Sequence, residues 1–278
     1  MLARMAHVNG AADGDVAAVA PTRRDRQHAR TRAEILAAGR ALVARGEELN
    51  LRAVARAVGM TAPGLYRYVD GQRDLLDAIG GALYDELIAE LVRARDAVDA
   101  ADLPQRLTDM AHAFRSWALA HRHEYAQLFA NPLTSEPDDT GAGCTHEGAE
   151  RFGAVFAEVF AAMWEAGIIT PPDLDRVDPV LLDRLETGGS GQVELPVALR
   201  YLFVRQWSRL YGMVTLEAFG HLHGSLRDGL PLFEATLADC AAELGWPDAQ
   251  EAPRTQRSNS RPNRRDATTR PTDPIASR

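Results

Sequence analysis

Apolar residues recur at intervals of three and four along most of this 278-residue chain, the spacing that places them on one face of an α-helix. No stretch alternates apolar and polar residues as a half-buried β-strand would. The pattern predicts helices over residues 30–45, 51–58, 62–69, 72–98, 104–121, 123–130, 147–166, 178–187, 195–223 and 230–245. We therefore expect an all-α protein.

Residues 51–70, LRAVARAVGMTAPGLYRYVD, have the pattern of two short helices joined by a glycine turn. Gly59 can adopt a positive φ at no steric cost, which ends the first helix sharply. Thr61 is a favourable N-cap for the second helix, and Pro63 suits its first turn. The small side chains at the start of the second helix let its backbone come close to base edges. This segment predicts a helix-turn-helix unit that enters a DNA groove.

Residues 29–89 resemble the DNA-binding unit of the tetracycline-repressor (TetR) family of bacterial regulators. Four segments carry the resemblance, in this order: RAEILAAGRALVARG, LRAVARAVG, MTAPGLYRYV and QRDLLDAIGGALYDEL. Its most specific part is a set of aromatic and aliphatic residues: Leu65, Tyr66, Tyr68, Val69, Leu75 and Leu76. The resemblance implies an N-terminal three-helix DNA-binding domain and a C-terminal helical bundle for ligand binding and dimerisation.

The resemblance also implies which residues contact double-stranded DNA: Arg52, Thr61, Ala62, Pro63, Gly64, Tyr66, Arg67, Tyr68, Gln72 and Arg73. Arg52 can reach guanine O6 and N7 with two donors, and Pro63 can touch a thymine methyl. The alternative for Arg52 is a solvated helix residue with no DNA role. Tyr66 is expected to place its hydroxyl, beside a buried ring, against a phosphate oxygen.

Gln72 is a departure from the family pattern, because many relatives carry a lysine there to hold a phosphate. Two explanations stay open. Arg73 supplies the anchoring charge, or the helix N-terminus and the Gln72 amide bind the phosphate without a formal charge. The second arrangement would flatten the salt dependence of DNA binding.

All 31 basic residues of the chain are arginine. Without lysine the chain has no phosphate-loop lysine, Schiff-base lysine or lysine general base, which excludes several enzyme classes. Its charge is uneven: residues 1–80 hold 12 arginines and nine acids, for a net +3, whereas residues 81–250 hold 12 arginines and 27 acids, for a net −15. Residues 251–278 carry a net +4. DNA contact is therefore expected at the N-terminal end.

We expect neither a metal nor a cofactor. Cys144 and Cys240 lack the spacing of a metal site or disulfide framework and fit a reducing cytoplasm. His121 with His123, and His221 with His223, are two apart and diverge on a helix, so helix capping is the better interpretation. Cys144, His146 and Glu147 offer three zinc ligands without a fourth. The chain also lacks a secretory signal pattern or a membrane-spanning apolar run, and a cytoplasmic location is expected.

The domain organisation follows from these patterns. We expect an N-terminal arm over 1–28, a DNA-binding domain over 29–89, a ligand-binding and dimerisation domain over 90–248, and a disordered tail over 249–278. The arm ends in four arginines that either remain mobile or follow the DNA minor groove: Arg23, Arg24, Arg26 and Arg30. The segments NPLTSEPDDTGAG and TGGSGQ are predicted loops and lack the lysine of a phosphate cradle.

A second resemblance lies in WSRLYGMVTLE, residues 207–217, which is similar to the Trp-His-Gly (WHG) type of C-terminal domain in the same family, with Tyr211 at the place of the usual histidine. It implies a small-molecule pocket, for which we name lining candidates whose alternative role is ordinary core: Trp117, Tyr125, Phe160, Trp207 and Tyr211. By the family's mechanism a ligand would shift helix 72–98, which Gly80 and Gly81 would help to bend.

Helix 195–223 has two apolar stripes and therefore needs two partners. One stripe holds Leu199, Leu202, Phe203, Leu210 and Met213, and the other Tyr201, Val204, Tyr211 and Leu222. We expect one partner to be a second copy of the chain, joined through helix 230–245, which would form a two-fold dimer.

Together these features predict a ligand-responsive, sequence-specific DNA-binding transcriptional regulator. The expected form is a repressor that a small apolar molecule releases from a palindromic operator. Two other classes stay open. One is a helical dimeric interaction protein with weak or lost DNA specificity, which Gln72 would suit. The other is a helical enzyme, for which the sequence offers no catalytic motif.

Overall fold

The computed structural model describes residues 22–130, 143–187 and 193–245, and within these ranges its regular structure is entirely helical. The prediction of an all-α fold is confirmed. The helices are α1 (Arg23–Ala44), α2 (Leu51–Ala57), α3 (Ala62–Leu65), α4 (Gln72–Asp96), α5 (Leu103–Ala120), α6 (Arg122–Phe129), α8 (Cys144–Glu165), α9 (Pro179–Thr187), α10 (Val197–Ala218) and α11 (Leu230–Glu243). None of them is long and apolar enough to cross a membrane. The predicted tail, most of both predicted loops and residues 1–21 of the predicted arm lie outside the described residues.

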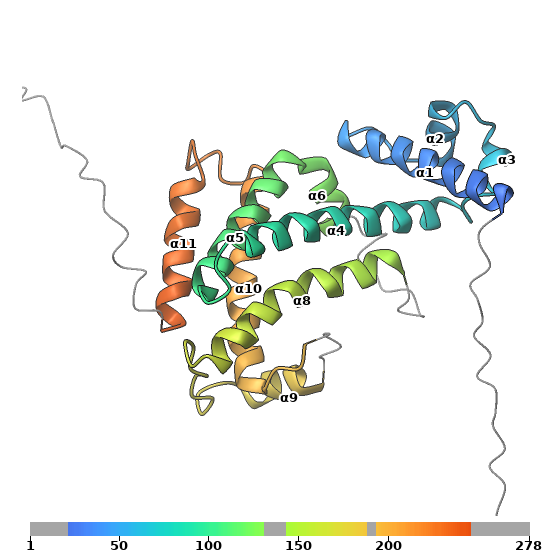
Figure 1. Cartoon of the computed structure of the whole chain (residues 1–278). Coiled ribbons are helices and arrows are strands. Elements are labelled where there is room, and N and C mark those ends of the chain that lie inside the picture. The colour runs from blue at the N-terminus through green and yellow to red at the C-terminus, as the bar shows by residue number, and fades with distance from the viewer. Residues whose placement is uncertain (1–21, 131–142, 188–192, 246–278) are drawn as a thin grey trace, which may run out of the picture.

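The helices form a small N-terminal unit and a larger body, joined by α4 (Figure 1). α1, α2 and α3 lie together at one end, and α4 runs from them into the body alongside α8. The N-terminal unit has its own apolar centre, in which side chains from all four helices are fully buried: Ile35, Val54, Leu65 and Leu75. Because burying apolar surface is the main favourable term in folding, these contacts fix α2 and α3 against α1 and α4.

Three helix boundaries differ from the prediction by four residues or more. α1 begins at Arg23, so residues 23–28 are helical and do not belong to an arm. Thr22 and Asp25 explain this start, because they form a capping box in which each side chain accepts a hydrogen bond from the other's backbone N–H. α3 ends at Leu65 and continues only as a turn. α10 ends at Ala218, where Gly220 takes a φ of +75°.

The glycine turn of the N-terminal unit is as predicted. α2 ends at Ala57, and Gly59 follows with a φ of +69°. Pro63 lies in the first turn of α3, also as predicted. Thr61 occupies the N-cap position of α3 as predicted, although its hydroxyl makes no capping hydrogen bond. Asn50 caps α2 by accepting a hydrogen bond from the Ala53 N–H at 2.9 Å.

α4 and α8 cross closely because glycine occupies the contact positions. A Cβ on Gly80 would overlap the Thr145 hydroxyl, and one on Gly81 would lie 2.6 Å from the Cys144 Cβ. The Asp77 carboxylate caps α8 by accepting hydrogen bonds from the Cys144 and Thr145 N–H groups, both at 2.9 Å. The structure therefore assigns Gly80 and Gly81 to close helix packing, whereas the sequence suggested bending.

The body has an aromatic centre to which α5, α6, α8 and α10 contribute. Phe114 lies 5.3 Å from Phe152 between ring centroids, and Phe152 lies 5.2 Å from Trp207. Beside this cluster, the Arg115 guanidinium donates to both carboxylate oxygens of Glu217, at 2.7 and 2.5 Å. This paired hydrogen bond ties α5 to α10 across 102 residues of sequence.

Candidate nucleic-acid interface and body pocket

The N-terminal unit has a surface depression of about 480 Å³ where the starts of α2, α3 and α4 meet. The structure brings five of the predicted DNA-contacting residues together around it: Arg52, Ala62, Pro63, Tyr66 and Gln72. Arg52 and Pro63 are exposed, and Ala62 is half-buried. The remaining wall comes from Glu48, Asn50 and Leu51. A cationic donor beside small side chains is the combination that base-edge contact requires.

Gln72 connects the start of α4 to the segment before α2. Its side-chain amide donates a hydrogen bond to the Leu49 carbonyl oxygen at 3.1 Å. This bond uses one of the two amide N–H groups and leaves the other for a ligand. Arg73, the next residue, is exposed. Both explanations of phosphate anchoring therefore have the groups that they need.

Tyr66 corrects the sequence interpretation, which expected a buried ring. Its side chain is 59% exposed, because α3 has ended and the ring extends from the following turn. An exposed phenol at the edge of the depression can still donate to a phosphate oxygen. Arg67 and Thr61 are exposed as well, and Gly64 is half-buried within α3.

α1 contacts the end of residues 62–69, the predicted second helix of the helix-turn-helix, called the recognition segment below. The sequence interpretation missed this contact. The His28 ring stacks on the Tyr68 ring at 4.7 Å, and its Nε2 lies 3.0 Å from the Arg67 carbonyl oxygen, to which it donates. Arg32 Nε donates to the Tyr68 carbonyl oxygen at 3.3 Å. The sequence interpretation placed His28 in the N-terminal arm, and it therefore did not predict that His28 lies on a helix. Tyr68 is thus a half-buried positioning residue as well as a DNA candidate.

The body contains an apolar cavity of about 70 Å³ between α5, α8, α10 and α11, called the body pocket below. Phe160 and Trp207, two of the five predicted lining residues, form part of its wall. The wall also includes residues that the sequence did not single out: Leu107, Thr108, Ala111, Phe156, Phe203, Gln206, Leu210, Leu237, Cys240, Ala241 and Leu244. The sequence carried no local signal for these residues, because they come from four helices that only packing brings together.

The other three predicted lining residues lie elsewhere in the body. The Trp117 indole donates to the Glu86 carboxylate at 3.2 Å. Tyr125 is fully buried, and its hydroxyl lies 2.7 Å from the Thr215 hydroxyl. Burial raises the pKa of Tyr125 despite this hydrogen bond, so the phenol stays neutral. Tyr211 is half-buried and packs edge-on against Phe129 at 5.5 Å between ring centroids, so its stripe of α10 faces the aromatic centre at this position.

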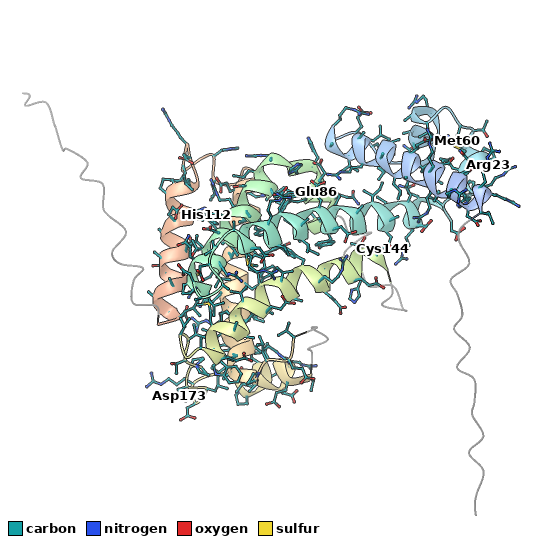
Figure 2. The ribbon with its side chains drawn as sticks, in the orientation of Figure 1. Arg23, Met60, Glu86, His112, Cys144 and Asp173 are labelled. Carbon is teal, nitrogen blue, oxygen red and sulfur yellow. The ribbon has the colours of Figure 1, made fainter. Side chains whose placement is uncertain are left out.

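Glu86 joins the N-terminal unit to the body. Figure 2 shows it midway along α4, between the unit that holds Arg23 and Met60 and the part of the body that holds His112. Its carboxylate pairs with Arg40 of α1 and accepts from Trp117 of α5, and His121 Nε2 lies 3.9 Å away. Burial acts to raise the pKa of Glu86, but these hydrogen bonds and charges outweigh it and lower the pKa.

This lowered pKa predicts an acid-dependent contribution of Glu86 to stability. A carboxylate with a lowered folded-state pKa stabilises fully above its ordinary value of 4.5 and loses that contribution as the pH falls through the folded-state value. We expect Glu86→Gln to lower the free energy of unfolding at pH 7 by less than about 1 kcal/mol, because the pair is about one-third exposed. The difference between variant and parent, measured by urea unfolding, should shrink as the pH falls below 4.5. A difference that stays constant as the pH is lowered would contradict the assignment.

The predicted capping role fits one of the histidines. His121 Nδ1 lies 3.0 Å from the Trp117 carbonyl oxygen and donates to it at the end of α5. Across the described ranges no three histidine, cysteine or acidic side chains converge as metal ligands would. Cys144 begins α8, and His146 lies 3.6 Å from Glu150 one turn further on.

The N-terminal unit and its exposed recognition segment define a helix-turn-helix protein with a helical companion domain. Residues 107–240 match the family model of the tetracyclin repressor-like C-terminal domain. The HTH-type transcriptional regulator Rv1816 of Mycobacterium tuberculosis is 31% identical over 178 residues, which cover 62% of this chain and 73% of that protein. The chain belongs to the TetR family of transcriptional regulators, which are not enzymes.

Solved structures give the same fold. SCO4313, described as a candidate regulatory protein, has a TM-score of 0.60 and 28% identity, with 80% of this chain and all of that chain covered. RolR, solved with resorcinol, has a TM-score of 0.52 and 13% identity, with 81% and 93% covered. The second likeness concerns the fold alone.

Proposed function

We propose that the chain is a homodimeric repressor that binds a palindromic operator in double-stranded DNA and is released from it by a small apolar molecule. One observation carries the DNA part of the proposal. One exposed depression is lined by Arg52, Pro63 and Tyr66, which differ in side-chain chemistry and in the DNA contact expected of each. Arg52 and Pro63 would read base edges, and Tyr66 would hold a phosphate. Arg67 and Arg73 are exposed on the same unit and would add phosphate contacts.

The dimer part rests on outward apolar side chains. Val204 and Leu216 of α10 are 43% and 44% exposed, and Leu232 of α11 is 40% exposed. A second copy packed two-fold on α10 and α11 would cover them, as isologous interfaces do. Two recognition segments would then face one side of the duplex, about 34–36 Å apart for successive major grooves.

The structure offers a path from the body pocket to the DNA-binding unit. α5 lines the pocket through Thr108 and Ala111, and about two turns later its Trp117 donates a hydrogen bond to Glu86. Glu86 in turn pairs with Arg40 of α1. A ligand that moves α5 would change this junction and the spacing of the two DNA-binding units. A ligand that favours the spacing unable to bind the operator by roughly 3–5 kcal/mol would release the DNA. RolR, which has the same fold, holds the small aromatic molecule resorcinol.

Arg52→Ala tests the DNA assignment. With a duplex that the full chain selects from a random pool, we expect a loss of affinity of about 5- to 150-fold, from the roughly 1–3 kcal/mol that a paired guanine contact contributes. Arg184→Ala, which removes the same charge from exposed α9, is the matched control and should leave affinity unchanged. If the chain binds the selected duplex no better than random DNA, specific regulation is refuted. An unchanged affinity in Arg52→Ala refutes only the residue assignment.

A salt titration decides how phosphate is anchored near Gln72. If Arg73 holds a phosphate, Arg73→Ala should reduce the slope of log affinity against log salt by about 1. Gln72→Ala should then leave the slope unchanged. The reverse outcome, with the slope untouched by Arg73→Ala and affinity lost in Gln72→Ala, would favour uncharged anchoring by the amide and the helix start.

A further inference from the structure

One face of α1 continues past the core of the N-terminal unit and reaches the recognition segment. His28, Ile35 and Leu42 recur at intervals of seven residues, which places them on one face of the helix. Ile35 and Leu42 are buried in the core of the unit, whereas His28 stacks on Tyr68 at 4.7 Å between ring centroids. Toward its start, this face of α1 therefore changes its partner from the core to the end of the recognition segment.

Arg24 lies on the same face, four residues before His28 and about one helical turn nearer the start of α1. An apolar side chain would continue the pattern at this position, but the core has ended and Arg24 is exposed. Figure 1 shows the start of α1 at the end of the unit where α3 and the start of α4 lie. Arg24 thus adds a cation to the contact face of α1, just beyond Tyr68 and the exposed Arg67.

The Arg24 guanidinium is free to bind a ligand. Within the described ranges it forms neither a hydrogen bond nor an ion pair. Asp25, the next residue, accepts from the Thr22 N–H and hydroxyl, at 2.9 and 2.7 Å, and does not pair with Arg24. Arg30 of the same helix differs, because it pairs with Glu34 at 3.1 Å.

The surroundings of Arg24 favour an anion. Residues 23–32 hold five arginines and one acid, a net +4. An arginine offers planar, paired donors that match the oxygens of a phosphate. Phosphates line both edges of a DNA groove, so a cation one turn beyond the recognition segment is placed for the backbone and not for the bases.

We propose that Arg24 binds a backbone phosphate at the edge of the groove that the recognition segment enters. This inference rests on the proposed DNA-binding function and adds a residue of α1 to its interface. The stack of His28 on Tyr68 holds the start of α1 in place, so Arg24 acts from a fixed helix, in contrast to a mobile arm in the minor groove. Because a phosphate carries no base information, Arg24 would strengthen binding to every duplex by a similar factor.

The test compares the full chain with Arg24→Ala on the selected duplex and on a random duplex, each at several salt concentrations. We expect Arg24→Ala to reduce the slope of log affinity against log salt by about 1 for each bound chain. Its affinity for the two duplexes should fall by the same factor. An unchanged slope would overturn the proposal. A fall confined to the selected duplex would overturn it as well, because it indicates contact with a base.

Two further variants locate the effect. Arg30→Ala is the matched control, since Arg30 is an exposed arginine on another side of the same helix, and it should leave the slope unchanged. An equal reduction in Arg30→Ala would show that the position of the charge on α1 is irrelevant. Arg24→Lys keeps the charge without the paired donors, so it should keep the slope and lose less affinity than Arg24→Ala. A slope reduced as in Arg24→Ala would contradict the role of the charge.

Failure of the proposed function is a separate result. If the parent chain binds the selected and random duplexes equally well, sequence-specific regulation is refuted. The slope measured with random DNA then still decides whether Arg24 contacts a phosphate, because that contact does not depend on sequence.

Discussion

Glu217→Ala is expected to lower the free energy of unfolding by about 3–5 kcal/mol, the cost of leaving one member of a buried ion pair without its partner. The Arg115 and Glu217 side chains are only 13% and 12% exposed. Arg115 also lies over the Phe233 ring of α11, 5.3 Å from its centroid. Without Glu217 the guanidinium would stay in this setting with neither water nor a carboxylate. Urea unfolding of the parent and variant measures the difference.

Two further variants show whether the cost comes from the stranded charge. The double variant Arg115→Met with Glu217→Leu removes both charges, and we expect it to be more stable than Glu217→Ala, because apolar replacements of a buried pair are often tolerated. Glu158→Ala breaks a pair with Arg95 in which Glu158 is 58% exposed, and it should cost less than about 1 kcal/mol. Equal losses in Glu158→Ala and Glu217→Ala would contradict the argument.

Gly80→Ala is expected to destabilise the protein by about 1–3 kcal/mol, the usual range for overpacking a filled interface. The new Cβ would overlap the Thr145 hydroxyl and lie 3.1 Å from the Thr145 Cγ2, so α4 and α8 would have to separate. Alanine normally favours a helix over glycine by about 0.5–1 kcal/mol, and the clash outweighs this gain. The midpoint of thermal unfolding measures the net effect.

Gly153→Ala is the matched control for this substitution. Gly153 lies within α8, and a Cβ there would meet nothing within 4 Å, so the variant should be as stable as the parent or slightly more stable. Adding Thr145→Ala to Gly80→Ala removes both atoms that the new Cβ meets first. The double variant should therefore lose less than the two single losses combined. If Gly80→Ala behaves like Gly153→Ala, close packing is not the role of Gly80.

Much of the fold is local and could be predicted from the sequence. Helix positions follow from apolar spacing, which is a property of a few neighbouring residues. The turn at Gly59 follows from the one residue type that takes a positive φ without strain. Even so, the start of α1 was misjudged, because the capping box of Thr22 and Asp25 was not recognised in a segment rich in arginine. The stacking of His28 on Tyr68 was not predicted either, because His28 was assigned to the arm and not to α1.

The two candidate sites differ in how far they could be predicted from the sequence. The predicted DNA-contacting residues lie within 22 positions of one another in the sequence, and the helix-turn-helix pattern alone predicted that Arg52 and Pro63 lie on related surfaces. The pocket draws on α5, α8, α10 and α11, so its membership depended on helix packing. Aromatic side chains were predicted as lining because they are large, yet Tyr125 and Tyr211 fill the centre of the body.

By itself, the sequence determined the helical class, the glycine turn and the family, because each depends on local pattern. Only the tertiary structure decided why Gly80 lacks a side chain, what Glu217 pairs with and which carboxylate the Gln206 amide donates to. These depend on partners 65, 102 and 37 positions away in the chain, at Thr145, Arg115 and Glu243. No local pattern records which distant side chains come into contact, since packing of whole helices selects them.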